Sequence, residues 1–207
     1  MPRLSRRFGM GTMRIAVTGG IACGKSTVAR MLGRFGGEVL DTDAVAHVLE
    51  GPGGAAVPIV AEAFGCGVVA ADGSVDRRRL GDLVFGDAAA LARLNAILHP
   101  MIASEVGDWL EEATAAPFKA VLVPLLYEAG FDTKVRWDKV LAVVCSESEQ
   151  IRRLKGRGFN ESEARMRIAA QMPCAEKAAR ADCVIWNDAD LRTLEGEVER
   201  ALKSLLA

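Results

Sequence analysis

The sequence predicts an α/β fold in which a parallel β-sheet is flanked by helices and carries a helical insert and a helical lid. Short apolar runs alternate with helical patterns along the chain, which is the order expected of such a sheet. Two runs, "KAVLVPLL" and "KVLAVVC", are continuously apolar, as is typical of parallel strands covered on both faces. The 207 residues, 50% of them hydrophobic, suffice for one substantial core.

The first elements are a strand, a helix and a second strand. "MRIAVTGG", residues 13–20, is a short apolar run that ends at glycines, which indicates a buried strand. A helix is expected to begin at Lys25, because apolar residues then recur with helical spacing until Gly36 and Gly37 end it. "EVLDTD", residues 38–43, is the predicted second strand.

The rest of the chain divides into an insert, two returning strands, a lid and a closing helix. Residues 44–115 hold helical patterns separated by glycine loops, and this stretch is too long for a simple crossover. Ser146 with Glu149, and Asn160 with Glu163, have the spacing of capping boxes at helix starts. "DCVIWN" is the last expected strand, before an amphipathic helix. We therefore predict a single domain over 13–207, with a core (13–43, 116–151 and 182–207), a helical subdomain (44–115) and a lid (152–181).

Residues 1–12 are expected to be a disordered extension, and Met13 is a candidate for the true start. Ser5, Arg6 and Arg7 imitate a twin-arginine export signal. A signal also needs an apolar segment and a cleavage site, whereas here the first strand follows directly.

Charge and cysteine content point to a protein of the cytoplasm that acts on small molecules. The 26 basic and 27 acidic side chains nearly cancel, so no overall field attracts nucleic acid or an anionic membrane. The five cysteines are scattered, without the pairs typical of a zinc site, and we expect reduced thiols. No apolar run reaches the roughly 18 residues of a membrane-spanning helix.

A phosphate-binding loop follows the first strand. Gly19, Gly24, Lys25 and Ser26 fit G-x-x-x-x-G-K-[ST], and they stand between a predicted strand and helix, which is the required context. Glycines allow backbone N–H groups to point at a phosphate, and the following helix adds its positive end. Lys25 would bridge the β- and γ-phosphates, and the Ser26 hydroxyl would bind Mg²⁺. The alternative, a glycine turn with a solvated lysine, does not explain the flanking elements.

This P-loop predicts ATP as the bound nucleotide. The DxxG and NKxD motifs of a GTPase are both missing, which leaves kinases and ATPases. The residues expected to contact ATP are Gly19, Gly20, Ala22, Cys23, Gly24, Lys25, Ser26 and Thr27.

Two acids follow the second strand, at the edge of the sheet where ligands of such folds bind. Asp41 or Asp43 can accept the proton of an attacking hydroxyl, or hold Mg²⁺ through water. The alternative is that Asp43 only caps the helix "AVAHVL". The residues alone leave the choice open.

Arginines form a second candidate group. Arg153 and Arg157 are four residues apart and are expected to share one helix face, from which a mobile flap would stabilise phosphate charge. Simple solvated charge is the alternative for both. Arg77 to Arg79 suit an anionic acceptor or, equally, an exposed surface. His47 and His99 show no partner spacing.

Eight segments in order resemble the dephospho-coenzyme A kinase family, over nearly the whole chain from Met13. They are "TGGIACGKST", "VLDTDAVAH", "DGSVDRRRL", "LNAILHPMI", "VPLLYEAGF", "WDKVLAVVCSESEQIRRLKGRG", "RIAAQMPCAEKAARAD" and "VIWN". The resemblance implies transfer of phosphate from ATP, with Mg²⁺, to the ribose 3′-hydroxyl of dephospho-CoA, the last step of coenzyme A biosynthesis.

The resemblance also assigns roles to residues. It makes 22–27 the ATP phosphate loop, Asp43 the base, and Arg153 and Arg157 the lid arginines. It implies that the insert grips dephospho-CoA, with Asp41, Arg77 and Gln171 as acceptor contacts.

This chain departs from the family in two places. Ala22 and Cys23 stand where glycine and a small residue are usual, and we expect an altered nucleotide affinity. Val123 replaces an acid, which leaves Asp41 or Asp43 to associate with Mg²⁺. Two rival functions remain, namely another small-molecule kinase, such as a nucleoside or nucleotide kinase, and a regulator that uses ATP occupancy as a switch. The oligomeric state is not predicted.

Overall fold

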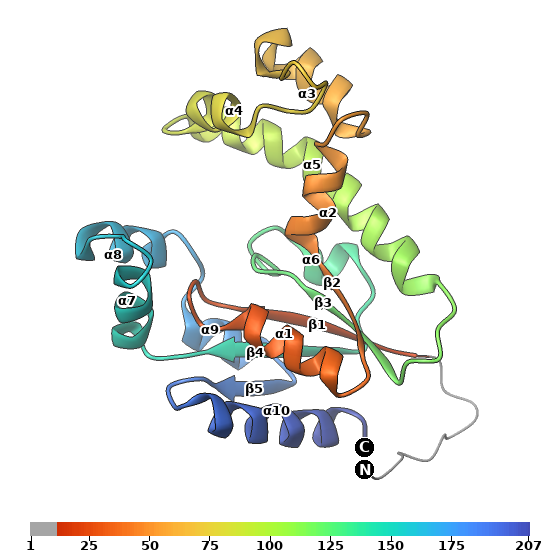
Figure 1. Ribbon diagram of the computed structural model, residues 1–207, viewed down its shortest axis with the longest axis vertical. Coiled ribbons are helices and arrows are strands. Elements are labelled where there is room, and N and C mark those ends of the chain that lie inside the picture. The colour runs from red at the N-terminus through yellow and green to blue at the C-terminus, as the bar shows by residue number, and fades with distance from the viewer. Residues whose placement is uncertain (1–11) are drawn as a thin grey trace. The chain divides into compact units, whose positions relative to one another are not determined.

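The computed structural model describes residues 12–207, and the chain forms two compact units (Figure 1). The first unit holds the described residues through Val39, Ala113–Pro124 and Trp137–Ala207, and the second holds Leu40–Glu112 and Leu125–Arg136. The predicted N-terminal extension lies, except for Thr12, outside the described residues.

A five-stranded sheet supports the first unit, and it confirms the predicted α/β class. Its order is β2-β3-β1-β4-β5, and β1 pairs in parallel with β3 on one side and with β4 on the other. The strands are β1 (Met13–Gly19), β2 (Glu38–Asp41), β3 (Phe118–Leu122), β4 (Lys139–Val144) and β5 (Cys183–Trp186). Because β1 is central, the loop that follows it leaves the middle of the sheet at its carboxyl edge.

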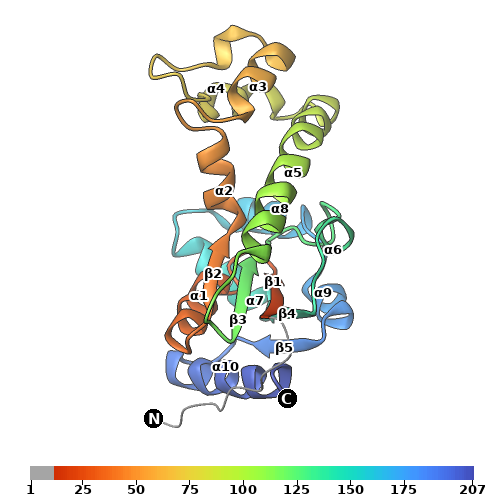
Figure 2. The same ribbon diagram turned by 90° about the vertical axis from the view of Figure 1, so that its right-hand side faces the viewer.

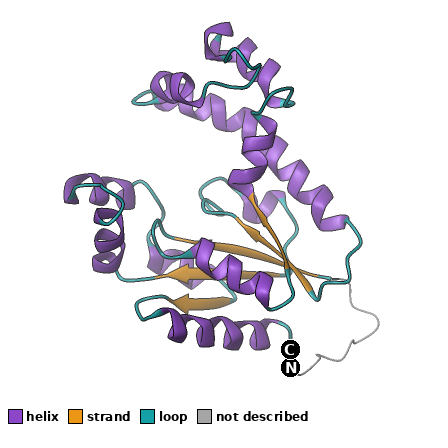
Figure 3. Ribbon diagram, viewed as in Figure 1, coloured by secondary structure: helices purple, strands orange, loops and turns teal. Residues whose placement is uncertain are grey.

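Helices cover both faces of this sheet (Figures 2 and 3). Helices α1 (Lys25–Arg34) and α10 (Leu191–Leu205) contact each other on one face, and α9 (Cys174–Arg180) packs on β1 and β4 from the other face. Helices α7 (Glu147–Lys155) and α8 (Glu161–Ala169) follow β4. Both begin where the capping-box spacing predicts, directly after Ser146 and Asn160.

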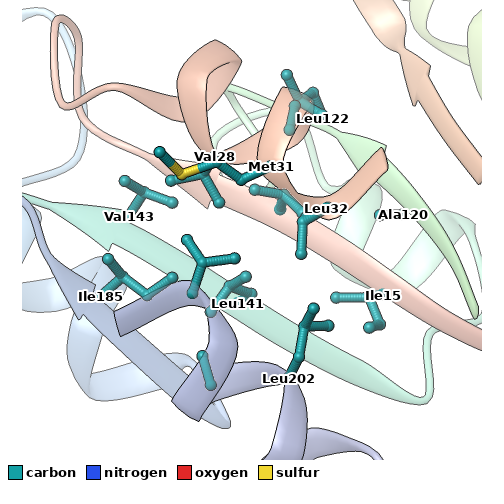
Figure 4. Packing of buried hydrophobic residues seen from close by; sticks show 14 of the residues in the cluster. Ile15, Val28, Met31, Leu32, Ala120, Leu122, Leu141, Val143, Ile185 and Leu202 are labelled. Carbon is teal, nitrogen blue, oxygen red and sulfur yellow. The ribbon is translucent and has the colours of Figure 1, made fainter. Parts of the chain in front are cut away.

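The main core lies between the sheet and helices α1 and α10 (Figure 4). Helix α1 contributes side chains with the predicted helical spacing, and these meet alternate residues of the central strands. The buried residues include Ile15, Val17, Val28, Met31, Leu32, Leu141, Val143, Ile185, Val198 and Leu202. Burial of this apolar surface fixes α1, and with it the C-terminal side of the phosphate loop, against the sheet.

The two predicted capping boxes have different outcomes. At α8, the Asn160 side chain accepts from the Glu163 N–H, and the Glu163 carboxylate accepts from the Asn160 N–H, so the box is complete. At α7, Ser146 accepts from the Glu149 N–H. The Glu149 carboxylate accepts instead from the guanidinium groups of the arginines at 152 and 153, which offer stronger, charged donors.

The second unit is helical. It consists of α2 (Thr42–Leu49), α3 (Ala56–Phe64), the short 3₁₀ helix η1 (Cys66–Val68), α4 (Arg77–Val84), α5 (Ala88–Glu111) and α6 (Phe131–Lys134). Helix α5 continues through Pro100 and contacts α2, α3 and α4. Within the described part of the chain, no helix is both long and apolar enough to cross a membrane.

The boundary between β2 and α2 differs from the prediction. The strand was expected to reach residue 43, but it ends at Asp41, and α2 begins at Thr42. The Asp41 carboxylate accepts from the Asp43 N–H at 3.0 Å and caps this helix, so an alternative hydrogen bond replaces further strand pairing. Residues 125–136, which the sequence assigned to the core, group with the helical unit. The functional subdivision into acceptor insert and lid stays a prediction.

Candidate nucleotide-binding and acceptor sites

The loop between β1 and α1 has the backbone that a phosphate-binding loop requires. Gly19 and Gly24 have φ angles of 147° and 96°, and Gly24 is the N-cap residue of α1. These conformations are open to glycine and strained for other residues. A Cβ atom added at Gly20 would also lie 2.5 Å from the Cys174 sulfur. Gly19 and Gly24 are therefore needed for their conformation, and Gly20, which lies between them, for space.

Ala22 is the exception among the described residues, because it is the only non-glycine residue there with a positive φ angle, 59°. The resemblance noted from the sequence implies glycine at this position. A left-handed conformation costs an L-residue roughly 1–2 kcal/mol. The loop keeps the glycine-like shape and pays for it with local strain.

The Lys25 side chain folds back over the loop. Its Nζ donates to the carbonyl oxygens of Gly19 at 3.0 Å and Gly20 at 2.8 Å. Lys25 is partly buried and begins α1, where the sequence analysis placed it. Ser26 is exposed in the first turn of α1, and the Thr27 hydroxyl accepts from Arg30. The Lys25 ammonium group therefore lies against the backbone of the loop.

Three side chains from distant segments support the loop. The Ile21 N–H donates to Gln171 Oε1 at 2.9 Å, and Gln150 Nε2 donates to the Ile21 carbonyl at 2.8 Å. Asn187 Nδ2 donates to the Cys23 carbonyl at 2.8 Å. Each bond fixes a backbone group of the loop, so its shape is set before any phosphate binds.

Arg153 also contacts the loop. It donates to the Ala22 carbonyl at 3.1 Å, to the Asn187 carbonyl at 2.8 Å and to Glu149 at 2.7 Å, and its side chain is only 20% exposed. The alternative that Arg153 is simple solvated charge is therefore wrong.

Arg157 differs from Arg153. Helix α7 ends at Lys155, so Arg157 lies in the following turn, and the shared helix face expected from the spacing is not formed. It is exposed, and its side chain makes no hydrogen bond or ion pair with any residue from 12 to 207.

The Glu149 carboxylate accepts hydrogen bonds from two arginines beside the phosphate loop. Hydrogen bonds from Arg152 and Arg153 lower the pKa of its carboxyl to about 2, so it stays charged across the physiological range. The carboxylate thereby orients the Arg153 guanidinium toward the loop carbonyls.

The second unit brings other predicted residues together. Asp43 lies exposed in the first turn of α2, and His47 lies one turn further along this helix. The Arg77 guanidinium hydrogen-bonds to the His47 ring and pairs with the Glu50 carboxylate at 2.5 Å. The N-cap is Asp41, so the alternative that Asp43 merely caps α2 is wrong. Asp43 and His47 thus lie one turn apart on α2, and Arg77, the first residue of α4, contacts His47; we call these three residues the polar row along α2.

Sequence reasoning missed Gln150, Asn187 and His47. Gln150 and Asn187 reach the loop from 129 and 164 residues away along the chain, and no local pattern marks such contacts. For His47, its position four residues after Asp43 on an apolar helix was an available signal. Over the described range, no group of three or more His, Cys, Asp or Glu residues is suited to hold a metal ion.

Comparisons with known proteins agree with this geometry. The family model for dephospho-CoA kinase matches residues 13–193. A dephospho-CoA kinase from Burkholderia lata is 46% identical over 176 residues, which cover 84% of this chain and 86% of that protein.

Solved structures show the same fold. A crystal structure of a Thermus thermophilus protein has a TM-score of 0.77 and 35% identity, and it covers 95% of this chain and 97% of that one. A dephospho-CoA kinase from Campylobacter jejuni, 21% identical, has a TM-score of 0.60 over 94% of this chain and 97% of that one, and supports the fold alone. By its family-model match and its identity to curated relatives, the chain belongs to the dephospho-CoA kinase family.

Proposed function

We propose that this chain transfers the γ-phosphate of ATP to the ribose 3′-hydroxyl of dephospho-CoA, giving CoA and ADP. The observation that carries the proposal is the glycine loop between β1 and α1, with Lys25 at its end, in a chain of this family. Phosphoryl transfer depends on positioning and on charge stabilisation, and this loop is built for both. Both substrates are soluble metabolites, so we place the activity in the cytoplasm.

In the first unit, Lys25 and the N–H groups of the loop would bind the phosphates of ATP. The Lys25 ammonium would exchange the carbonyls of Gly19 and Gly20 for the β- and γ-phosphates, which are stronger, charged acceptors. The exposed hydroxyl of Ser26, in the first helical turn, fits a Mg²⁺ ligand. Mg²⁺ supplies neutralisation of phosphate charge when it is bound with ATP.

Arg153 and Arg157 are proposed to act on the phosphates in different ways. Arg153 is held by Glu149 against the loop, so it contributes fixed positive charge beside the phosphate site. Arg157 is exposed at the end of α7, and we propose that it reaches the transferred phosphoryl group when the lid residues 152–181 close. Gln171, assigned to the acceptor by resemblance, contacts Ile21 of the loop, and its acceptor contact stays a prediction.

In the second unit, the polar row along α2 is proposed to bind the acceptor. Asp43 would accept the proton of the 3′-hydroxyl as general base, because its carboxylate is exposed and is not used as the helix cap. Asp41 caps the start of this helix, and the acceptor contact that the resemblance assigns to it stays a prediction. Arg77, held by Glu50 and His47, offers a cation for an anionic part of dephospho-CoA.

The test is an ADP-release assay with Mg-ATP and dephospho-CoA, run beside AMP and nucleosides. We expect dephospho-CoA to be preferred by a wide margin, and mass spectrometry of the product to place the new phosphate on the ribose 3′-oxygen. Faster phosphorylation of AMP would favour a nucleotide kinase. ATP hydrolysis that no acceptor stimulates would favour the regulatory switch.

A further inference from the structure

Three thiols from separate segments converge beneath the phosphate loop. The Cys23 sulfur lies 3.4 Å from the sulfur of Cys145, just after β4, and 3.6 Å from the sulfur of Cys174, the first residue of α9. All three are free cysteines and belong to the first compact unit. The proposed phosphoryl transfer uses none of these sulfurs, so their proximity calls for another explanation.

The three thiols differ in access to solvent. Cys23 is fully buried and Cys145 is 2% exposed, whereas Cys174 is partly exposed. Cys174 is therefore the most accessible of the three to a small oxidant, and the Cys23 sulfur already lies 3.6 Å from its own. Cys145 is nearer to Cys23 but is shielded from such an oxidant.

We propose that Cys174 and Cys23 form a reversible disulfide that weakens ATP binding by the loop. This inference rests on the proposed function, because it assumes that the loop holds ATP. It defines an oxidative modification site whose partner reagent is a low-molecular-weight disulfide.

The chemistry balances in two exchange steps. The Cys174 thiolate attacks the small disulfide and forms a mixed disulfide, and one small thiolate leaves. Cys23 then loses its proton and attacks the Cys174 sulfur, so the protein disulfide forms and the second small thiolate leaves. Two protein thiols are oxidised, and one small disulfide is reduced to two thiols.

Geometry explains why the bond would disturb the loop. The sulfurs, now 3.6 Å apart, must approach by about 1.5 Å to reach a bond length of about 2.05 Å. The Cys23 carbonyl is held by Asn187, and Gly20 leaves no room on the other side, because Cys174 already packs against it. The strain therefore falls on the peptide units that should point at the phosphates.

Cys23 and Cys174 are chemically quiet at neutral pH, whereas the hydrogen bond with Cys23 lowers the pKa of the buried Cys145. The hydrogen bond with Cys145, together with burial, raises the pKa of Cys23 to about 11, and the contact with Cys23 raises the pKa of Cys174. The thiolate fraction is then small, so the exchange is slow and proceeds under sustained oxidation rather than at once.

Peptide mapping tests the bond directly in the full chain. The protein is incubated with oxidised glutathione, alkylated under denaturing conditions and digested with trypsin without reduction. Trypsin places the three thiols in separate peptides, 15–25, 140–152 and 168–177. We expect peptide 15–25 joined to 168–177. A link from 15–25 to 140–152, or only glutathione adducts, overturns the assignment.

The effect on the loop is measured by calorimetric titration with Mg-ATP. We expect the oxidised protein to bind ATP about tenfold more weakly, equivalent to about 1.4 kcal/mol, and dithiothreitol to restore binding. Formation of the bond without a change in affinity overturns the regulatory part. A reduced protein that binds no ATP overturns the proposed function instead, while the mapping still decides whether the bond forms.

Two variants complete the test. Cys174→Ser is expected to keep the affinity of the reduced protein and to lose the response to oxidised glutathione. Cys66→Ser is the matched control, because Cys66 is exposed and lies in the other compact unit, so this variant should respond like the parent. An equal response of both variants contradicts the proposal.

Discussion

The guanidinium group of Arg153 donates a hydrogen bond to the carbonyl oxygen of Ala22 across 3.1 Å. This bond joins α7 to the one described non-glycine residue with a positive φ angle. The strained residue Ala22 is therefore also the one that Arg153 holds by a hydrogen bond, and the shape of the loop depends on both features.

Ala22→Gly tests the strain at this position. Removing the left-handed penalty of roughly 1–2 kcal/mol outweighs the extra chain entropy of glycine, about 0.4–1 kcal/mol, so the free energy of unfolding should rise slightly or stay unchanged. Denaturant titration measures it. The control is Ala29→Gly in α1, expected to cost about 1–2 kcal/mol, because glycine is unfavourable in a helix and the change also removes a buried methyl group. Equal destabilisation by both changes would show that Ala22 carries no strain.

Lys25→Ala should lower turnover by several orders of magnitude, because it removes the charge proposed to bridge the β- and γ-phosphates. The fold should persist, although Lys25 is partly buried, because the two hydrogen bonds to the Gly19 and Gly20 carbonyls lie in the loop and the change leaves the core between the sheet, α1 and α10 intact. Turnover and thermal melting are measured on the same sample. Lys203→Ala, in the exposed part of α10, should behave as the parent. Near-normal turnover of Lys25→Ala contradicts a catalytic loop.

Asp43→Asn should depress turnover by about 10²–10⁴, because an amide cannot accept the hydroxyl proton, while ATP affinity stays close to that of the parent. Asp41→Asn is the matched control. Asparagine is also a good N-cap, so this variant should keep stability and lose far less turnover than Asp43→Asn. If only the Asp41 change harms turnover, the base assignment is wrong.

Arg153→Gln and Arg157→Gln should separate two roles. The first change breaks three hydrogen bonds at the loop, so both ATP affinity and the free energy of unfolding should fall, the latter by about 1–3 kcal/mol. The second should lower turnover only, since the Arg157 side chain makes no hydrogen bond or ion pair with residues 12–207. Steady-state kinetics with varied ATP checks both. Unchanged turnover in Arg157→Gln would return this residue to solvated surface charge.

Glu149→Gln should alter the pH dependence of stability. The pKa of Glu149 is lowered to about 2, so its charged form stabilises the fold above its ordinary value of 4.5. This stabilisation, about 1 kcal/mol for a partly exposed pair, is lost as the pH falls from 4.5 toward 2. Unfolding is followed at pH 6 and at pH 3. The free energy of unfolding of the parent should exceed that of the variant by more at pH 6 than at pH 3. The same difference at both pH values would argue against the ion pairs.

Local patterns predicted the parts of the fold that local chemistry decides. The apolar run before Gly19 and the helix beginning at Lys25 are set by burial and by glycine, and both were predicted. The end of β2 was predicted two residues too late, because a single side-chain bond from Asp41 decides it. The pattern of apolar residues does not reveal such a helix cap.

The contacts of the site depend on the tertiary fold. Gln171 was selected through the family resemblance, but its bond to Ile21 joins residues 150 positions apart. Arg153 and Arg157 look equivalent in spacing, yet α7 ends between them and only Arg153 reaches the loop. The residue types therefore identified the segments that form the site, whereas the hydrogen-bond partners within it depend on how the fold packs.

The central position of β1 has a consequence for how the molecule assembles. Both neighbours of this strand, β3 and β4, lie about a hundred residues or more downstream, and such non-local pairings slow folding. During synthesis, the first strand and its glycine loop emerge early and must wait for partners, including Asn187, that emerge near the end. The segment made first is thus among the last to acquire its native shape, and chain truncations before residue 187 should leave a nucleotide loop without its final support.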